Sequence, residues 1–464
     1  MAESTVFERA LVRLRRAWRE VAGRGESAVP RAHLPDDDAE RLRAQMRACL
    51  EAAGGEVSAR ARAADLGRAY LSLDATGRAR FLTIMAEDFA ADRAKIDAAI
   101  EVVRAASPGE GRARAERALA RSLVAPRVRL LTQFNALDQG VKFLVDMRAE
   151  LLGLARKGSP ALSGLEADLK DLLASWFDVG FLELRRITWN APAALLEKLA
   201  AYEAVHAIAS WQDMKNRLDS DRRCFAYVHP RMPEEPLIFV EVALVRGLAD
   251  SVQRLLDEAA PAEDPRLADT AIFYSISNAQ KGLAGISFGA FLIKRVAGEL
   301  QAEFPRLKTF ATLSPIPGFR AWLDETLEDG ALTTTEWAAL RTSPLRVGDS
   351  DMLKAALAAP SWASDVAMAA QLQAPLTRLC ARYLLEARRE ATRARDPVAH
   401  FHLSNGARME RLNWMGDRSP KGLGESCGLM INYLYRLEDI ETNHEAYVSE
   451  GRIAAAQAVR AFLI

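Results

Sequence analysis

Hydrophobic positions follow two different patterns along this chain, and the pattern changes near residue 175. Before that point the chain is rich in Ala, Arg, Leu and Glu, and apolar residues recur at helical spacing with almost no strand-like runs. The segment 135–152 is typical, because one stripe of a helix there would hold Leu137, Val141, Leu144 and Arg148. Glycine and proline breakers divide the region into segments. The pattern predicts an all-helical bundle over residues 1–175 that acts as a scaffold or an oligomer interface.

The composition shifts to mixed α and β after Trp176. Two β-prone runs, 224–228 and 237–244, flank a turn rich in Pro and Glu, which predicts an antiparallel hairpin. We expect a helical segment over 244–259 and then another strand, 271–276. The order of helix, hairpin, helix and strand predicts a mixed α/β domain in the second part of the chain.

A glycine-rich turn follows that strand. Three glycines fall within eight residues, at Gly282, Gly285 and Gly289, and a helical pattern then runs over 288–304. Such a loop brings backbone N–H groups to a helix N-terminus, where the macrodipole favours phosphate. A further strand, 309–313, leads to Ser314, which two prolines then hold in a rigid turn. This layout is typical of a nucleotide-phosphate site with a polar side chain beside it.

The glycine spacing excludes two common nucleotide loops. A dinucleotide fingerprint needs GxGxxG directly after a strand, and a P-loop needs GKS or GKT at its end; the chain has neither here. The loop of acetyltransferases is matched in part by Lys281-Gly282-Leu283-Ala284. The flanking elements therefore favour an acyl-CoA fold. The alternative from the loop alone is a tight strand-to-helix turn, in which the glycines serve close packing.

Two of the six histidines, His400 and His402, lie close together in a second informative segment. In an extended segment their rings would share a face, and in a turn they would diverge. No acidic or cysteine ligand stands at a recognised metal-binding spacing, so we expect no metal. A hydrogen-bonded structural role is the alternative for each ring.

Composition limits the possible partners. Lys plus Arg and Asp plus Glu number 62 each in 464 residues, so no overall field would recruit nucleic acid or an anionic membrane. No apolar run approaches the roughly 18 residues of a membrane span.

The expected compartment is the cytoplasm. The four cysteines form no CxxC pair, which predicts free thiols. The Arg-rich N-terminus resembles a transit peptide, but its glutamates argue against one. The last residues, 461–464, are not a peroxisomal SKL signal.

Several co-linear motifs together resemble the malonyl-CoA decarboxylase family: FYSIS, QKGLAGISFGAFLIKRV, LSPIPGF, FHLSNGA, LNWMGD and SCGLMINYLY. The resemblance spans residues 175–447 and implies an α+β protein. A helical oligomerisation domain, 1–175, would precede a catalytic domain of the GNAT acetyltransferase fold, 176–464. It further implies conversion of malonyl-CoA to acetyl-CoA and carbon dioxide, in fatty acid and malonate metabolism, without biotin, pyridoxal phosphate or a metal. CoA is part of the substrate, and the assembly would be a homotetramer built from dimers.

The resemblance also implies the site residues. Its catalytic serine and histidine correspond to Ser314 and His402, and Ser275 matches a position near the substrate. The acyl-CoA loop would comprise Gly282, Ala284, Gly285, Ile286, Ser287, Phe288, Gly289 and Ala290. Animal members have a glutamate at the position of Ser287, so another group would take over any role of that carboxylate. His400 is not carried over, since the family has Asn or a similar residue there.

The chemistry suits these residue types. Loss of carbon dioxide leaves an electron pair beside the thioester, which can hold it as an enolate. A histidine near its ordinary pKa suits the delivery of one proton to carbon, so we expect His402 to protonate the enolate. Ser314 would orient the malonyl carboxylate or accept a proton. The structural alternative is that Ser314 only caps the turn before Pro315.

Two other functions fit parts of the pattern. A GNAT acyltransferase would move an acyl group from CoA to an amine, and would need an acceptor channel and a general base. A non-catalytic acyl-CoA sensor would bind malonyl-CoA, release no acetyl-CoA and recruit a partner through its helices.

Overall fold

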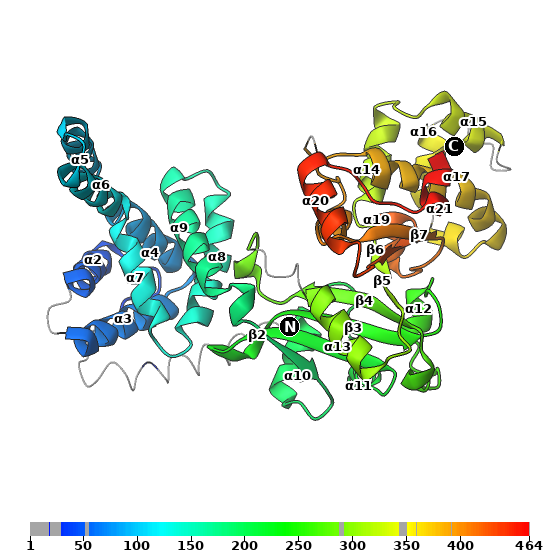
Figure 1. Ribbon diagram of the computed structural model, residues 1–464, viewed down its shortest axis with the longest axis horizontal. Coiled ribbons are helices and arrows are strands. Elements are labelled where there is room, and N and C mark those ends of the chain that lie inside the picture. The colour runs from blue at the N-terminus through cyan, green and yellow to red at the C-terminus, as the bar shows by residue number, and fades with distance from the viewer. Residues whose placement is uncertain are drawn as a thin grey trace. The chain divides into compact units, whose positions relative to one another are not determined.

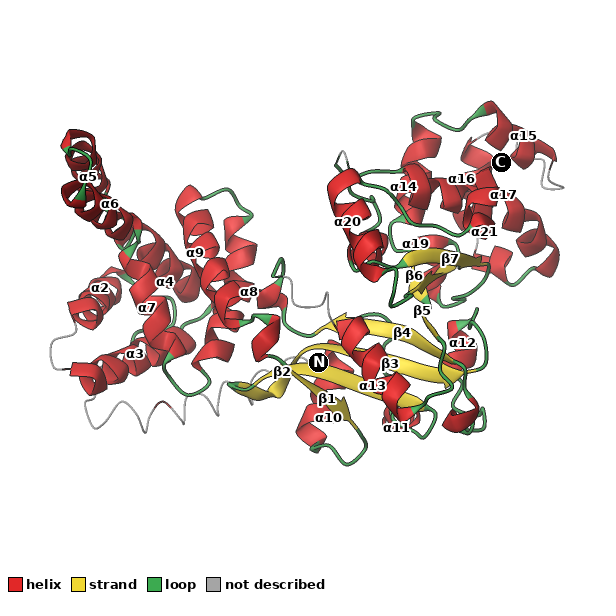
Figure 2. Cartoon of the chain, viewed as in Figure 1, coloured by secondary structure: helices red, strands yellow, loops and turns green. Residues whose placement is uncertain are grey.

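The computed structural model describes residues 18, 29–51, 55–286, 292–342, 350–358, 360–390 and 392–463. The chain divides into two compact units. The first holds residues up to 183 together with 228–237 and 279–288, and the second holds the remainder. Figures 1 and 2 show the elements of each unit.

The first unit is built mainly of helices, as the sequence predicts, although most of its residues 228–237 belong to strands. Amphipathic segments of Ala, Leu and Arg bury their apolar stripes against one another. The helices of this unit are α2 (Asp36–Glu51), α3 (Gly55–Ser72), α4 (Ala75–Asp88), α5 (Arg93–Ala105), α6 (Glu110–Leu123), α7 (Pro126–Asn135), α8 (Gly140–Ala155) and α9 (Pro160–Trp176).

The expected continuous helix over 135–152 is wrong at its start. Helix α7 ends at Asn135, Gln139 has a left-handed φ of 52°, and α8 begins at Gly140. A Cβ at Gly140 would lie 1.9 Å from the carbonyl oxygen of Phe134, so the close approach of the two helices requires glycine there. The predicted stripe is buried, with Leu144 fully enclosed.

The second unit contains a mixed sheet, which confirms the predicted change of fold. Among the described residues the sheet has eight strands, in the order β1-β2-β3-β4-β5-β8-β6, with β7 beside β8. They are β1 (Glu183–Ile187), β2 (Arg222–His229), β3 (Met232–Val245), β4 (Thr270–Asn278), β5 (Thr309–Thr312), β6 (Ser314–Pro315), β7 (Arg408–Asn413) and β8 (Met430–Leu434). Strands β4 and β5 are parallel, whereas the pairs β3–β4, β5–β8, β6–β8 and β7–β8 are antiparallel. That this domain has the GNAT acetyltransferase fold stays a prediction.

Helices accompany the sheet in the second unit, and one of them, α18 (Pro397–Ser404), carries a residue of the site described below. The helices are α10 (Ala193–Tyr202), α11 (Trp211–Arg217), α12 (Val252–Leu255), α13 (Leu292–Glu303), α14 (Phe319–Glu328), α15 (Thr334–Thr342), α16 (Ser350–Ala358), α17 (Val366–Glu386), α18 (Pro397–Ser404), α19 (Pro420–Ser426), α20 (Ile440–Glu450) and α21 (Gln457–Arg460). One apolar core joins strands and helix α12, through residues that include Ala243, Ile272, Leu313 and Met430.

The predicted helix over 244–259 is largely wrong. Strand β3 continues to Val245 because its apolar run is buried in the sheet, and only 252–255 are helical. Gly247 interrupts the segment with a φ of 70°, and its N–H donates to Asp269. The turn at Gly247 therefore interrupts the predicted helix, and only the short helix 252–255 forms after it.

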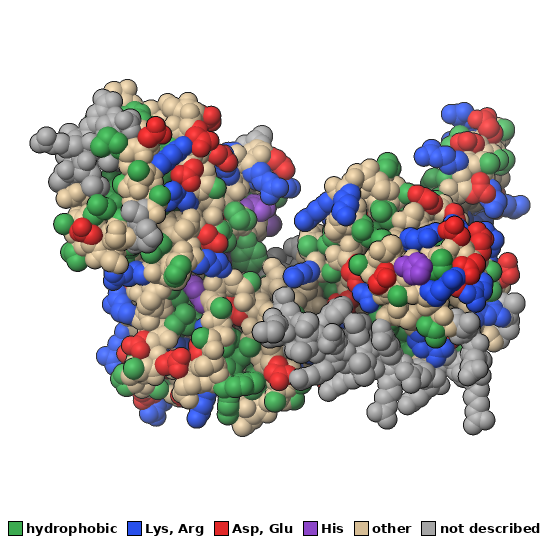
Figure 3. Space-filling model, turned by 180° about the vertical axis from the view of Figure 1, so that it is seen from behind, with side chains coloured by type: hydrophobic (Ala, Val, Ile, Leu, Met, Phe, Trp, Pro, Cys, Tyr) green, Lys and Arg blue, Asp and Glu red, His purple; other side chains and the backbone are tan. Residues whose placement is uncertain are grey.

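The chain's balanced charge is visible on its surface. On the face shown in Figure 3, Lys and Arg side chains lie among Asp and Glu side chains. Among the described residues, no helix is both long and apolar enough to cross a membrane. The four cysteines are buried and unpaired, as predicted.

Candidate active site

The sheet opens where the parallel pairing of β4 and β5 ends. Strands β4 and β5 pair as far as Phe273 and Thr312, and Leu313 N–H still donates to the Phe273 carbonyl at 3.0 Å. After that, β6 pairs with β8, while the rest of β4 pairs with β3. Ser314 is the first residue of β6 and therefore stands at this split.

Ser314 is buried, and its hydroxyl lies between two polar side chains. Its Oγ donates to Thr312 Oγ1 at 2.8 Å and lies 3.0 Å from His402 Nε2. Residues 312 and 314 share a face of the strand because side chains alternate. Thr312 is itself fixed, since its Oγ1 accepts from Tyr433 N–H at 3.1 Å. The structure thus brings together the two residues predicted to be catalytic.

His402 is carried by helix α18, whose start is well defined by the sequence. Asp396 is the N-cap and Pro397 occupies the first turn, a common arrangement at helix starts. Because both histidines are helical, their rings diverge: His400 Nδ1 lies 2.9 Å from the Tyr447 hydroxyl instead. His400 therefore fits the structural alternative.

The imidazole of His402 is enclosed by aromatic rings. Tyr433 stacks on it at a centroid distance of 4.4 Å, and the Tyr435 hydroxyl lies 2.8 Å from Nδ1. This burial lowers the pKa of His402 to about 3, because the charged form loses its hydration. The expectation of a near-ordinary pKa is therefore wrong, and the ring is neutral at pH 7 in the unliganded protein.

Both ring nitrogens of His402 have a hydroxyl within hydrogen-bond distance. Nε2 faces Ser314 Oγ at 3.0 Å, and Nδ1 faces the Tyr435 hydroxyl at 2.8 Å. The result is a chain of hydrogen bonds from Tyr435 through His402 and Ser314 to Thr312.

The carboxylate of Asp396 joins the backbones that carry both catalytic residues. One oxygen accepts from Val398 and Ala399 N–H at the start of α18, at 3.0 and 2.9 Å. The other accepts from Gly318 N–H at 3.2 Å, in the turn that follows Ser314. Asp396 is buried, and burial raises the pKa of its carboxyl group. This one side chain therefore fixes the spacing of the serine turn and the histidine helix.

Ser275, predicted near the substrate, lies on β4 and is buried. Its hydroxyl contacts both carboxylate oxygens of Glu203 at 2.8 Å. Ser277 donates to the same carboxylate at 3.1 Å. Ser275 thus helps to hold Glu203 and the loop that follows it.

The predicted acyl-CoA loop is described only in part and within the first unit. Arg148 donates to the carbonyl of Gly282 at 2.6 Å and to that of Ala284 at 3.0 Å. A Cβ at Gly282 would lie 1.8 Å from the Val145 carbonyl oxygen, so this glycine serves close packing, as the alternative interpretation of the loop holds. Gly285 has a φ of 75°, which favours glycine. Ile286 ends this part, and Ser287, Phe288, Gly289 and Ala290 lie outside the described residues.

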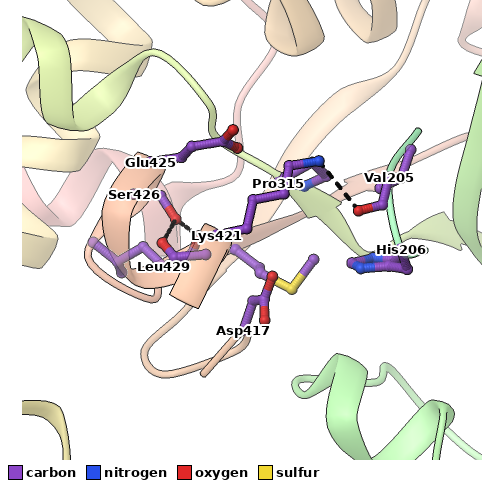
Figure 4. Close-up of a pocket in the computed structure, with 10 residues that line it drawn as sticks. Val205, His206, Pro315, Asp417, Lys421, Glu425, Ser426 and Leu429 are labelled. Carbon is purple, nitrogen blue, oxygen red and sulfur yellow. Dashed lines mark hydrogen bonds between the residues drawn. The ribbon is translucent and has the colours of Figure 1, made fainter. Parts of the chain in front are cut away.

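A small cavity lies beside the split in the sheet. His206, Asp417 and Lys421 line it together with Pro315, the residue after Ser314, and Met430, the partner of Pro315 across the strands. Figure 4 shows the Lys421 side chain reaching to the carbonyl of Val205, the residue before His206. The sequence pattern did not single out these polar residues. The signal available was that His206 is one of only six histidines in the chain.

The described residues contain no group of three or more His, Cys, Asp or Glu side chains that could hold a metal ion.

Comparisons with known proteins match almost the whole chain. Residues 180–464 match the family model of the malonyl-CoA decarboxylase C-terminal domain, and residues 89–177 match that of the N-terminal domain. A mitochondrial malonyl-CoA decarboxylase of Anser anser anser is 39% identical over 419 residues, which cover 87% of this chain and 83% of the goose protein.

Two crystal structures of malonyl-CoA decarboxylases are also similar. The enzyme of Rhodopseudomonas palustris superposes with a TM-score of 0.82 at 43% identity, covering 91% of this chain and 99% of the other. That of Agrobacterium vitis has a TM-score of 0.82 at 41% identity, with coverages of 91% and 100%.

Proposed function

Because this chain belongs to the malonyl-CoA decarboxylase family, we propose that it converts malonyl-CoA to acetyl-CoA and carbon dioxide at the Ser314–His402 pair. It is a carboxy-lyase. The observation that carries the catalytic assignment is the 3.0 Å contact between Ser314 Oγ and His402 Nε2, made between two buried side chains.

The reaction needs an electron sink and one proton. When the bond to carbon dioxide breaks, its electron pair passes to the carbon beside the thioester, and the thioester carbonyl holds it as an enolate. The substrate therefore supplies its own sink, and biotin, pyridoxal phosphate or a metal has no necessary part. The enolate carbon then takes one proton and becomes the methyl group of acetyl-CoA.

Ser314 would orient the malonyl carboxylate and His402 would supply the proton. In the free protein the His402 ring is neutral, since burial lowers its pKa to about 3. A bound carboxylate, and later the enolate, brings a negative charge next to the ring and raises that pKa. The proton that ends on carbon thus enters His402 from solvent when substrate binds.

A direct assay tests this function. Purified protein with malonyl-CoA should release carbon dioxide and acetyl-CoA in equal amounts. Transfer of the acyl group to an added amine would favour the acyltransferase alternative. Binding of malonyl-CoA without release of acetyl-CoA over hours would favour the sensor alternative.

The assembly and the compartment stay predictions. We propose a homotetramer of paired dimers in contact through the helical region, and light scattering of the purified protein tests it. Imaging of the tagged chain in cells tests the predicted cytoplasmic location.

A further inference from the structure

The loop 203–209 is held by an unusual number of side-chain bonds to its backbone. Glu203 accepts from the N–H groups of Val205 and His206 at 2.8 and 2.9 Å. Lys421 Nζ donates to the carbonyls of Ala204 and Val205, at 2.8 and 3.3 Å. The loop therefore holds the His206 ring in a defined place.

Arg217 completes the support of this loop. It donates to the carbonyl of His206 at 2.9 Å and to that of Ala207 at 3.3 Å. Arg217 is itself buried and paired with Asp213 and Glu241, at 2.7 and 3.1 Å. A buried guanidinium is costly unless it is paired, and Arg217 has both carboxylate partners. This paired side chain therefore holds the loop in one position.

His206 Nε2 has no partner within this network. The atom is buried, and no described residue offers it a hydrogen bond. Leaving such a group unsatisfied costs roughly 1–3 kcal/mol, which indicates that something outside the chain satisfies it. The adjoining cavity has a volume of about 10 Å³, enough for one small polar group.

The unpartnered atom is a hydrogen-bond acceptor. The ring makes a hydrogen bond to the Tyr274 backbone, and since Nε2 has no partner, Nδ1–H is the donor to that carbonyl. Burial lowers the pKa of His206 to about 4, although Asp417 opposes the shift, so the ring is neutral at pH 7. Nε2 then carries a lone pair and needs an N–H or O–H donor.

We propose that His206 Nε2 accepts a hydrogen bond from an amide N–H of the pantetheine arm of the substrate. The inference rests on the proposed function. A malonyl carboxylate, a thioester carbonyl and a phosphate offer only acceptors, whereas the arm that leads to the thioester carries two amide N–H groups. The arm also carries one hydroxyl, which lies farther from the thioester than either amide. The cavity is also lined by Pro315, which directly follows Ser314 in β6.

The test compares substrates with and without those amides. We expect His206→Ala to lower kcat/KM about tenfold for malonyl-CoA and malonyl-pantetheine, the usual cost of one hydrogen bond. Malonyl butanethiol, which has no amide, should react equally well with both proteins. His206→Gln places an amide oxygen near the position of Nε2 and should restore most of the loss. His33→Ala, a change of an exposed histidine in the first unit, is the matched control.

Equal losses with all three thioesters, or no loss with any, would overturn the inference. Calorimetry with acetyl-CoA needs no turnover and gives an independent result: binding to His206→Ala should be about tenfold weaker, and unchanged binding counts against the contact. If the wild-type protein binds acetyl-CoA but releases no carbon dioxide, the proposed function fails separately from this contact.

Discussion

His402 Nε2 lies 3.0 Å from Ser314 Oγ, although 88 positions separate the two residues in the chain. The contact joins a short strand at the split of the sheet to a helix that begins at an aspartate cap. A buried hydroxyl and a neutral imidazole at this distance form a unit that can orient a carboxylate and pass one proton.

Removal of the Tyr435 hydroxyl should slow turnover. Tyr435→Phe leaves the buried His402 Nδ1 without its 2.8 Å partner, so the ring is no longer held in one orientation and one tautomer. We expect kcat to fall about tenfold, equivalent to roughly 1.4 kcal/mol, and KM to change little. Steady-state kinetics with malonyl-CoA measure both.

Tyr433→Phe is the matched control for that change. Tyr433 stacks on the same imidazole, but its buried hydroxyl has no hydrogen-bond partner among the described residues. Its kcat should stay within about twofold of wild type. A Tyr435→Phe enzyme as active as this control would show that the Nδ1 contact has no part in catalysis.

Asp396 should act as a positioning residue. Asp396→Ala removes the bonds to Gly318, Val398 and Ala399, and so frees the serine turn from the histidine helix. We expect kcat to fall about tenfold or more, with a loss of about 1–2 kcal/mol in the free energy of unfolding. In a Ser314→Ala background the same change should cost no further activity, because the pair that it aligns is already absent.

Asp365 is the matched control, because it caps a different helix, one that does not carry His402. It accepts from Ala367 and Met368 N–H at the start of α17, so Asp365→Ala should lower stability by a similar amount and leave kcat unchanged. If the activity losses of Asp396→Ala and Ser314→Ala add up in the double variant, Asp396 acts only as a helix cap.

Acid should destabilise the protein partly through His402. An unfolded histidine takes up a proton near pH 6.5, whereas the folded pKa of about 3 keeps His402 neutral. The unfolded state therefore binds more protons as pH falls below about 6.5, and the folded state loses stability. Between pH 7 and pH 5 this amounts to about 2 kcal/mol. Glu241 has the opposite effect on stability. Burial is the chief reason that its pKa is raised to about 8, so the folded state takes up this proton before the unfolded state as pH falls.

Comparison with His402→Gln isolates this contribution. The stability advantage of the wild type over the variant should shrink by about 2 kcal/mol between pH 7 and pH 5, as measured by urea unfolding at both values. A constant difference would mean that the folded His402 has an ordinary pKa.

The sequence predicts the two-part fold because its signals are local. Helical periodicity in the first unit and the β-prone runs 224–228 and 271–276 all correspond to observed elements. The helix expected over 244–259 is wrong at 246–251, because Asp269 holds the turn at Gly247 and a local pattern does not reveal that contact. Asp396-Pro397 is a recognisable helix start, and it would have placed His400 and His402 on a helix.

The site was predictable only as separate residues. The motifs indicated Ser314 and His402, but the low pKa of His402 arises from rings at Tyr433 and Tyr435, brought there by a different strand. The acceptor role of His206 likewise depends on its bond to Tyr274, far along the chain. Such properties are set by tertiary contacts, and spacing along the chain does not encode them.

The most direct measurement is the rate of carbon dioxide release from malonyl-CoA by the wild type and by His402→Gln, with acetyl-CoA binding measured on the same samples. We predict that the variant loses roughly 10²–10⁴-fold in kcat and binds acetyl-CoA as the wild type does. A kcat within about twofold of wild type, with binding intact, would contradict the assignment of His402 as the proton donor.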